Sequence, residues 1–204
     1  MPYAAQIVKY LDGDLETTAK HIANKPGNTT ASWGPYSGSS TQSPGGALSG
    51  VGADFRLVIV GHGDPQSTSI GNNNLSAKKL AEVVSIWLGG TKIKRISLHM
   101  CYGGGNRGSA TGADVEQFTV RPQNSFAAKF ASYCGQLTQD VTARTDSVAG
   151  TFTENESGCT TSFKRTVGDR HKAQGDKLVF TTNPQSTLNE PKDATRQFVW
   201  VDVD

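Results

Sequence analysis

The sequence has few cysteines, and they follow no pattern that binds zinc or cross-links a small fold. Only three of the 204 residues are cysteines, Cys101, Cys134 and Cys159, and no two of them form a Cys-x-x-Cys pair. An odd number without such a pair argues against a disulfide framework and against a cysteine zinc site. We therefore expect reduced thiols and no metal site.

The chain also lacks a strong charge of either sign and any long apolar run. It carries 20 basic and 18 acidic side chains, a net charge of +2, so no bulk field attracts nucleic acid or an anionic membrane. No apolar stretch approaches the roughly 18 residues that a membrane-spanning helix needs, and the start MPYAAQIVKY lacks the features of a signal peptide. We expect no nucleic-acid binding, no membrane span, and export only by a dedicated route or within a larger parent chain.

The composition is that of one globular domain with one long loop. With 35% apolar and 19% charged residues, the chain can bury one substantial core. Residues 33–53 are rich in Gly, Ser and Thr, and such a segment cannot bury enough surface to become ordered at low cost. We expect a single domain over 1–204, with 33–53 as a loop.

Strand-like and helix-like segments alternate along the chain. Apolar runs predict strands at 3–9, 56–60, 94–100, 139–145, 178–182 and 197–203. Helical periodicity and capping residues predict helices from Asp14 to about Asn24, from Ser76 to Gly89, and from Asn124 to Gly135. The Gly-, Thr- and Ser-rich stretch that follows 139–145 and runs to about residue 162 alternates enough to form a hairpin or flap. This alternation predicts a parallel α/β sheet with its site at the carboxyl ends of the strands.

Two reactive side chains follow two of these strands. His62 comes after RLVIVG and Cys101 directly after RISLHM, with room between them for the helix of a parallel crossover. A cysteine attacks a carbonyl as the thiolate, and a nearby imidazole accepts its proton. We predict a catalytic His62/Cys101 pair, with the N–H groups of Gly63 and Cys101 as an oxyanion hole.

The order of these blocks resembles that of caspase-like cysteine proteases, which include caspases, metacaspases, legumain, gingipains and clostripain. It is most similar to the self-cleaving protease domain of multifunctional autoprocessing RTX toxins and large clostridial glucosylating toxins. The resemblance covers roughly residues 3 to 182, through AQIVKYLDGDLETTAKHIANK, LVIVGHG, LSAKKLAEVV, ISLHMC, NSFAAKFASYCGQLTQDVTART and KLVFTT. It implies a caspase-like three-layer α/β/α sandwich with a mostly parallel central sheet, a β-hairpin flap and a His62/Cys101 dyad. It also implies cleavage on the carboxyl side of a residue held in one deep pocket.

The substrate and the activator have candidate residues as well. We expect the pocket walls near Cys101 and at 144–150, with Gly103 and Ser147 as substrate-binding candidates. The toxin domains are switched on by inositol hexakisphosphate, and Lys172 and Lys177 are the matching basic candidates, although ESGCTTS stands where a basic pair is expected. No required cofactor is implied. The implied setting is a bacterial toxin or effector that cleaves its own parent chain or a host protein in a reducing compartment such as the host cytosol.

Two other histidines, His99 and His21, are assigned roles outside catalysis. His99 lies two residues before Cys101, about 6.5 Å away at the rise of a strand, which is too far for a direct hydrogen bond, so we expect a wall or core residue. His21 lies off the apolar stripe of its helix and is expected to be solvated. No residue that orients the imidazole is assigned, because Asp64 precedes Pro65 and reads as a turn residue.

The remaining two cysteines are not expected to be catalytic, and two alternative functions stay open. Cys134 falls on the apolar face of its helix and is expected in the core, whereas Cys159 is expected in an exposed loop. A catalytically silent caspase-like module that binds a partner protein or an inositol phosphate is an alternative function. A thiol hydrolase or acyltransferase on the same fold is another. The oligomeric state stays open.

Overall fold

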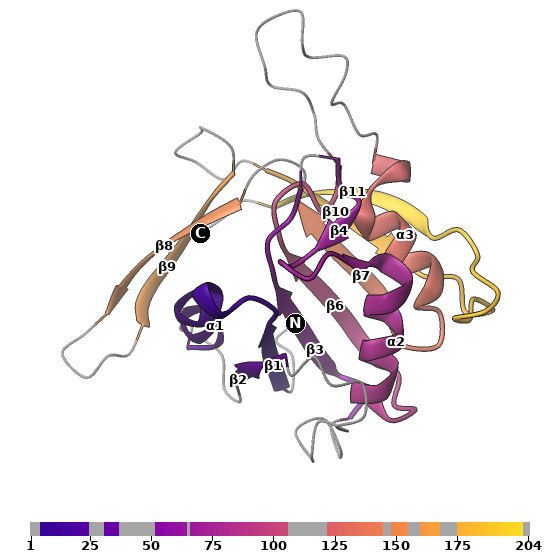
Figure 1. The fold of residues 1–204 in the computed structure, drawn as a ribbon, viewed down its shortest axis with the longest axis horizontal. Coiled ribbons are helices and arrows are strands. Elements are labelled where there is room, and N and C mark those ends of the chain that lie inside the picture. Colours follow the sequence, from indigo (N-terminus) through magenta and orange to yellow (C-terminus); the bar gives the residue numbers. More distant parts are fainter. Residues whose placement is uncertain are drawn as a thin grey trace, which may run out of the picture.

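A seven-stranded mixed sheet forms the centre of the protein (Figure 1). The computed structural model describes residues 5–24, 31–36, 52–64, 66–105, 122–144, 148–154, 160–167 and 175–201. The strands lie in the order β11-β10-β7-β6-β3-β1-β2, with the bounds β1 Ala5–Tyr10, β2 Ala31–Pro35, β3 Phe55–Val60, β6 Ile93–His99, β7 Thr138–Arg144, β10 Gly175–Thr181 and β11 Thr195–Val201. Strands β2, β1, β3, β6 and β7 are parallel, and β10 and β11 are added in antiparallel pairs. The predicted α/β class with a mostly parallel sheet is confirmed.

Strands β3 and β6 lie in the middle of this sheet. Every side chain of β3 except that of Arg56 is buried, and so are the last four side chains of β6, in the segment ISLH. Continuous burial is typical of parallel strands with both faces covered. The predicted strands at 56–60 and 94–100 are therefore confirmed to within one residue at each end.

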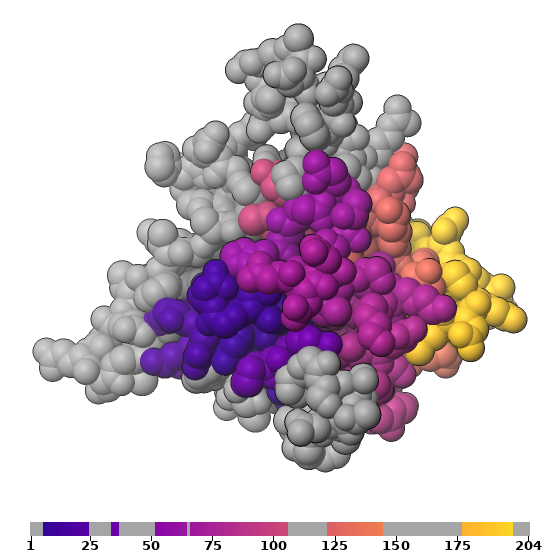
Figure 2. All heavy atoms as spheres, viewed as in Figure 1, coloured from indigo at the N-terminus to yellow at the C-terminus, as the bar shows by residue number. Residues whose placement is uncertain are grey.

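Helices pack on both faces of the sheet. Helices α2 (Ala77–Leu88) and α3 (Phe126–Tyr133) share one apolar cluster with Leu57, and α1 (Glu16–Ala23) shares another with Val58. Adjacent residues of a strand point to opposite faces, so the two clusters lie on opposite sides of the sheet. In Figure 2, α2 occupies the centre of the visible surface, between the N-terminal segment in indigo and the late segment in yellow. Among the described helices, none has the length and apolar character that crossing a bilayer requires.

Two short hairpins stand outside the central sheet. Strands β4 (Ser69–Ile70) and β5 (Leu75–Ser76) pair antiparallel directly before α2. Strands β8 (Val148–Glu154) and β9 (Thr160–Val167) form a longer hairpin on the same side of the molecule as α1, and β9 contacts α1 (Figure 1). The hairpin expected in this stretch is therefore confirmed.

The start of the predicted loop 33–53 is wrong, because residues 31–35 form an edge strand. Strand β2 pairs with β1 in parallel register, from Gln6 opposite Ala31 to Tyr10 opposite Pro35. A proline is compatible with an edge strand, since only one side of that strand donates to the sheet. Residues 37–51 of the predicted loop lie outside the described residues.

The predicted caps are right for one helix and wrong for two. Ser76 accepts a hydrogen bond from the backbone N–H three residues on, and Gly89 ends α2 in the left-handed conformation, both as predicted. The cap of α3 is Ser125, one residue later than the predicted Asn124. Asp14 caps no helix, because a 3-10 turn, η1 (Gly13–Leu15), precedes α1, and its side chain contacts another residue instead.

The prediction of a solvated His21 is also wrong. His21 is buried, with 1% of its surface exposed, beside Ala19, Ile22 and Ala23 of the same helix. Helix α1 is covered on more than one side, since it packs on β1 and β2 and also contacts β9. The sequence showed only the apolar stripe that faces the sheet, so the second covered side was not expected.

We predict that truncating a buried side chain of α2 destabilises the fold far more than truncating an exposed one. Leu80 is fully buried, so Leu80→Ala is expected to lower the free energy of unfolding by about 2–5 kcal/mol. The matched control is Ile86→Ala on the same helix, where 42% of the side chain is exposed and a loss below about 1 kcal/mol is expected. Urea unfolding followed by circular dichroism measures both, and equal losses would contradict the packing described.

Candidate active site at the ends of parallel strands

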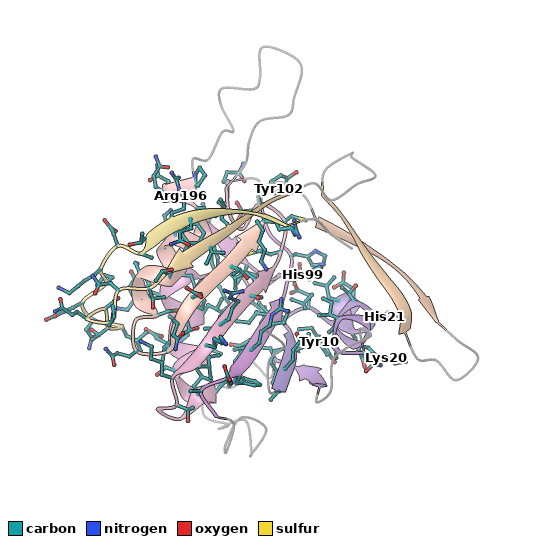
Figure 3. The ribbon with its side chains drawn as sticks, turned by 180° about the vertical axis from the view of Figure 1, so that it is seen from behind. Tyr10, Lys20, His21, His99, Tyr102 and Arg196 are labelled. Atoms are coloured by element: carbon teal, nitrogen blue, oxygen red, sulfur yellow. The ribbon has the colours of Figure 1, made fainter. Side chains whose placement is uncertain are left out.

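His62 and Cys101 follow neighbouring parallel strands at the same edge of the sheet. In the register of β3 and β6, Val60 lies opposite His99, and the Gly61 N–H donates to the His99 carbonyl at 3.2 Å. His62 and Cys101 each lie two residues beyond this last pair. Figure 3 labels His99, at the carboxyl end of β6, and Tyr102, the residue after Cys101.

Gly63 brings the loop of His62 against the backbone of Cys101. A Cβ atom at Gly63 would lie 2.0 Å from the Cys101 carbonyl oxygen and 3.0 Å from its carbon. No side chain fits in that space, so glycine is required for this close approach. The two predicted catalytic segments therefore touch through their backbones.

Asp14 contacts the imidazole of His62, a relation that the sequence prediction missed. Its Oδ2 lies 2.8 Å from His62 Nε2, and 63% of the Asp14 side chain and 47% of the His62 side chain are exposed. Asp14 belongs to η1, which follows β1, and β1 lies next to β3. The available signal was that an acidic residue follows a third parallel strand at the same edge.

Asp64 has the turn role that the sequence indicated. Its carboxylate accepts hydrogen bonds from the backbone N–H groups of Thr68 at 3.1 Å and of Ser69 at 3.0 Å. These bonds close the turn between His62 and β4. Asp64 therefore orders the loop, and the carboxylate on the imidazole comes from Asp14.

A second carboxylate fixes the backbone of His62. Asp12 is buried, and its Oδ2 accepts from the His62 N–H at 2.8 Å while its Oδ1 accepts from the Asn72 N–H at 2.7 Å. A buried carboxylate needs such donors to offset its desolvation. Asp12 thus joins the loop after β1 to both ends of the segment that carries His62.

The turn that carries Cys101 is held by α3 and β7. The Gly104 N–H donates to the Arg144 carbonyl at 2.8 Å, and the Gly103 carbonyl accepts from the Ala127 N–H at 2.9 Å. Gly103 is buried, and a Cβ atom there would lie 2.7 Å from Met100 Cγ. Glycine is therefore needed at 103 for packing, and substrate binding by Gly103 stays a prediction, while Ser147 lies outside the described residues.

The two described thiols differ in their surroundings. Cys101 is half-buried, whereas Cys134 is fully buried, and burial raises the pKa of the Cys134 thiol well above its usual value. Cys134 is thus a core residue, as predicted, and His99 is buried in the sheet, as expected for a wall or core residue. Cys159 lies outside the described residues.

Lys177 lines a small basic cavity on the face of the sheet where α1 packs. The cavity, of about 10 Å³, is also lined by Arg56, His99 and Arg144. Arg56 donates from Nε to Ser97 Oγ at 3.0 Å and from Nη1 to Gln6 Oε1 at 3.3 Å. This volume is near the lower limit for one water molecule, and Lys172 lies outside the described residues.

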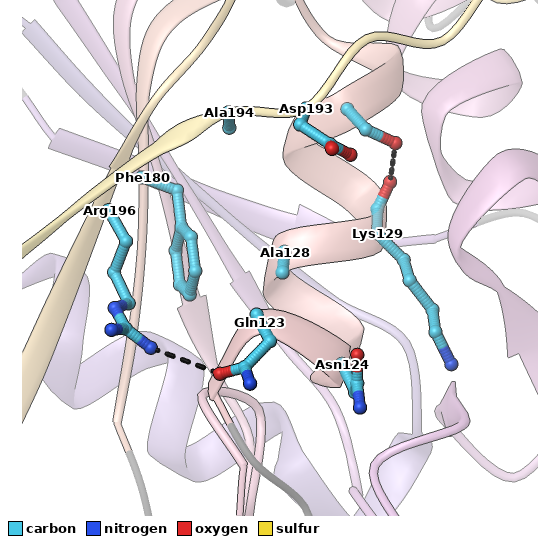
Figure 4. A pocket seen from close by; sticks show the side chains of 9 residues that line it. Gln123, Asn124, Ala128, Lys129, Phe180, Asp193, Ala194 and Arg196 are labelled. Atoms are coloured by element: carbon cyan, nitrogen blue, oxygen red, sulfur yellow. Dashed lines mark hydrogen bonds between the residues drawn. The ribbon is translucent and has the colours of Figure 1, made fainter.

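A larger cavity, which neither His62 nor Cys101 lines, lies between α3 and the segment that leads into β11 (Figure 4). Its volume is about 680 Å³, and it is lined by Gln123, Asn124, Ala128, Lys129, Ser132, Phe180, Asp193, Ala194 and Arg196. Arg196 Nη1 donates to Gln123 Oε1 at 3.2 Å within it. The lining holds no histidine or cysteine, so this cavity does not contain the reactive pair.

Comparisons with protein-family models, with curated proteins and with solved structures found no match to this chain. Among the described residues there is no group of three or more His, Cys, Asp or Glu side chains that could hold a metal ion.

The raised pKa of Cys134 predicts a loss of stability in alkaline solution. Above the usual thiol pKa of 9.0, the unfolded chain releases the Cys134 proton while the folded chain retains it. The free energy of unfolding should then fall by up to about 1.4 kcal/mol per pH unit from this group. Urea unfolding at pH 7 and pH 10, in a Cys101→Ala background with and without Cys134→Ala, measures it. An identical pH dependence in both chains would contradict the assignment.

Proposed function

We propose that this chain is a caspase-like cysteine endopeptidase with Cys101 as nucleophile and His62 as proton acceptor. The observation that carries the proposal is the meeting of the two segments at one sheet edge, with Gly63 against the Cys101 carbonyl. A mostly parallel sheet, helices on both faces and a hairpin after β7 support the caspase-like type. The proposal therefore predicts that the protein cleaves peptides and that this cleavage requires Cys101.

The contact of Nε2 with Asp14 leaves Nδ1 as the nitrogen of His62 that can act as a base. If Nε2–H donates to the Asp14 carboxylate, Nδ1 carries the lone pair of the neutral imidazole. Nδ1 is then the nitrogen that takes the proton from Cys101 Sγ. The carboxylate also stabilises the imidazolium that results.

The reaction proceeds by acyl transfer through the thiol. Thiolate Sγ attacks the peptide carbonyl carbon, and the carbonyl electron pair moves to the oxygen, which the N–H groups of Gly63 and Cys101 hold. Collapse of this intermediate breaks the C–N bond, and the leaving amine takes the proton from His62. Water then attacks the thioester with His62 as base, which releases the acid and restores the thiol.

The proposed setting follows from the resemblance of the sequence to the self-cleaving protease domains of bacterial toxins. The Cys101 thiol is not in a disulfide, and the proposed setting is a reducing compartment, such as the host cytosol, where thiols stay reduced. The proposed substrate is a protein or peptide, either the parent chain of this domain or a host protein. A bacterial toxin or effector is the class of protein that would carry such a domain.

Cleavage of a peptide library should separate the roles of Cys101 and Asp14. Cys101→Ala is expected to abolish cleavage, and Asp14→Asn is expected to lower kcat/KM about 10- to 100-fold because the imidazole loses its orienting partner. The measurement is product formation by mass spectrometry.

The matched control is Asp54→Asn, because Asp54 is a similarly exposed acid in an ion pair of 2.9 Å with Lys94. Asp54→Asn should leave kcat/KM unchanged. Cleavage that persists in Cys101→Ala would sink the proposal, and equal losses in the two Asn variants would remove Asp14 from the mechanism.

The basic cavity favours a second candidate, a module that binds inositol hexakisphosphate or a similar polyanion. Lys177, Arg56 and Arg144 gather there, and Arg144 is buried. Polyphosphates bind such clusters through charge-assisted hydrogen bonds. Because the cavity holds no more than about one water molecule, the groups that cover it would have to move for the ligand to enter.

We expect inositol hexakisphosphate to raise the melting temperature, and Lys177→Gln to weaken its binding about tenfold, the loss of one charge-assisted bond. Lys94→Gln is the control, since Lys94 pairs with Asp54 outside the cavity. If binding of inositol hexakisphosphate also speeds alkylation of Cys101, the result supports a regulated protease. If binding leaves the alkylation rate of Cys101 unchanged, it supports the silent module. Absence of any thermal shift contradicts an activator role.

A further inference from the structure

Ser67 belongs to the loop that carries His62, and it is hydrogen-bonded to the turn that carries Cys101. It is fully buried, and its hydroxyl donates to the Tyr102 carbonyl at 2.7 Å and accepts from the Phe126 N–H at 2.9 Å. Tyr102 is the residue after Cys101, and Phe126 is the first residue of α3. One hydroxyl therefore joins the loop of His62, the turn of Cys101 and the start of a helix.

Both Ser67 and Tyr102 have strained backbones. Their φ angles are 54° and 56°, in the left-handed region that residues with a side chain rarely adopt. Such conformations persist only where the surroundings hold them, and they concentrate at functional sites. The carbonyl of the strained Tyr102 accepts from the Gly105 N–H at 2.9 Å within the turn and from the Ser67 hydroxyl, which is the contact with the His62 loop.

Two further hydrogen bonds hold the loop that carries His62 and Ser67. The Ser67 N–H donates to the Asp64 carbonyl at 2.9 Å, and the Asp12 carboxylate fixes the His62 N–H at 2.8 Å. These bonds hold the loop in place, and Ser67 adds a hydrogen bond from the loop to the Cys101 turn. Gly63 adds a contact between the same two segments without a hydrogen bond from a side chain.

We infer that Ser67 is a positioning residue that sets the placement of the Cys101 thiol relative to the His62 imidazole. The inference rests on the proposed peptidase function, and it assigns to the buried hydroxyl a role in catalytic geometry as well as in packing. Without the hydroxyl, the Cys101 turn loses the bond from Ser67 while its bonds to Arg144 and Ala127 remain. The turn can then relax toward α3 and β7 and away from His62.

The test measures alkylation of Cys101 by iodoacetamide at pH 7, read by mass spectrometry on the peptide that contains Cys101. Ser67→Ala is expected to slow alkylation about tenfold, because the thiolate loses its imidazolium neighbour. It should lower kcat for peptide cleavage about 10- to 100-fold with little change in KM, since reacting groups are misplaced while substrate contacts remain. Ser67→Gly suits the left-handed backbone but also lacks the hydroxyl, and it should show the same losses.

Ser125→Ala is the matched control. Ser125 is a buried serine that caps the same helix, by accepting from the Ala128 N–H at 3.2 Å, and its hydroxyl donates to the Pro122 carbonyl. It should lower the melting temperature without changing the alkylation rate. If Ser67→Ala does not fold, Ser67→Gly carries the comparison, because its backbone strain is relieved.

A double-mutant cycle with His62→Ala separates positioning from general destabilisation. If Ser67 acts through the relation of thiol and imidazole, Ser67→Ala should slow alkylation only while His62 is present. An equal effect in both backgrounds, or rates that match wild type in Ser67→Ala and Ser67→Gly, would overturn the inference. A wild-type chain that cleaves no peptide would refute the proposed function, and the alkylation cycle would still report on Ser67.

Discussion

The parallel pairing of β3 with β6 is the constraint on which the rest of the site depends. Because both strands run in the same direction, their carboxyl ends emerge at one edge, and the register that sets Val60 opposite His99 brings the next residues of each strand to the same level. An antiparallel pair would place His62 and Cys101 at opposite ends of the sheet. Arg56 of β3 helps to hold this register, since a shift by one residue would turn its side chain from Ser97 and Gln6 toward the apolar face under α2 and α3.

The strands set the edge, and polar groups of the loops set the local geometry. Asp12 fixes the backbone of His62, Asp14 contacts its ring, and Ser67 joins its loop to the turn after Cys101. The two buried groups among them, Asp12 and Ser67, use their hydrogen-bonding capacity on backbone groups, as buried polar groups must. These polar groups act together with Ile70 and Met100, two residues of the same segments that are buried in the apolar core.

The two faces of the sheet have different characters, which bears on how the proposed activity could be regulated. The face under α2 and α3 is apolar, whereas the other face has an apolar cluster under α1 and also carries Arg56, Arg144 and Lys177 around a small cavity. Buried cations are costly unless they are compensated. Arg144 also connects this face to the site, because its side chain lines the cavity and its carbonyl accepts from Gly104 in the turn of Cys101. Movement of Arg144 toward an anion would thus act on the segment that holds the proposed nucleophile, Cys101.

The sequence by itself determined the α/β class, the central strands, the caps of α2 and the core position of Cys134, because these follow from local periodicity and from residues close together in the chain. It also indicated His62 and Cys101 as the pair at the strand ends. Only the tertiary structure brought Asp14 to His62, buried His21 beneath a second cover, added β2 at the edge and joined Ser67 to Tyr102. Each of these depends on contacts between segments far apart in the chain, and such contacts leave no periodic pattern in a single sequence.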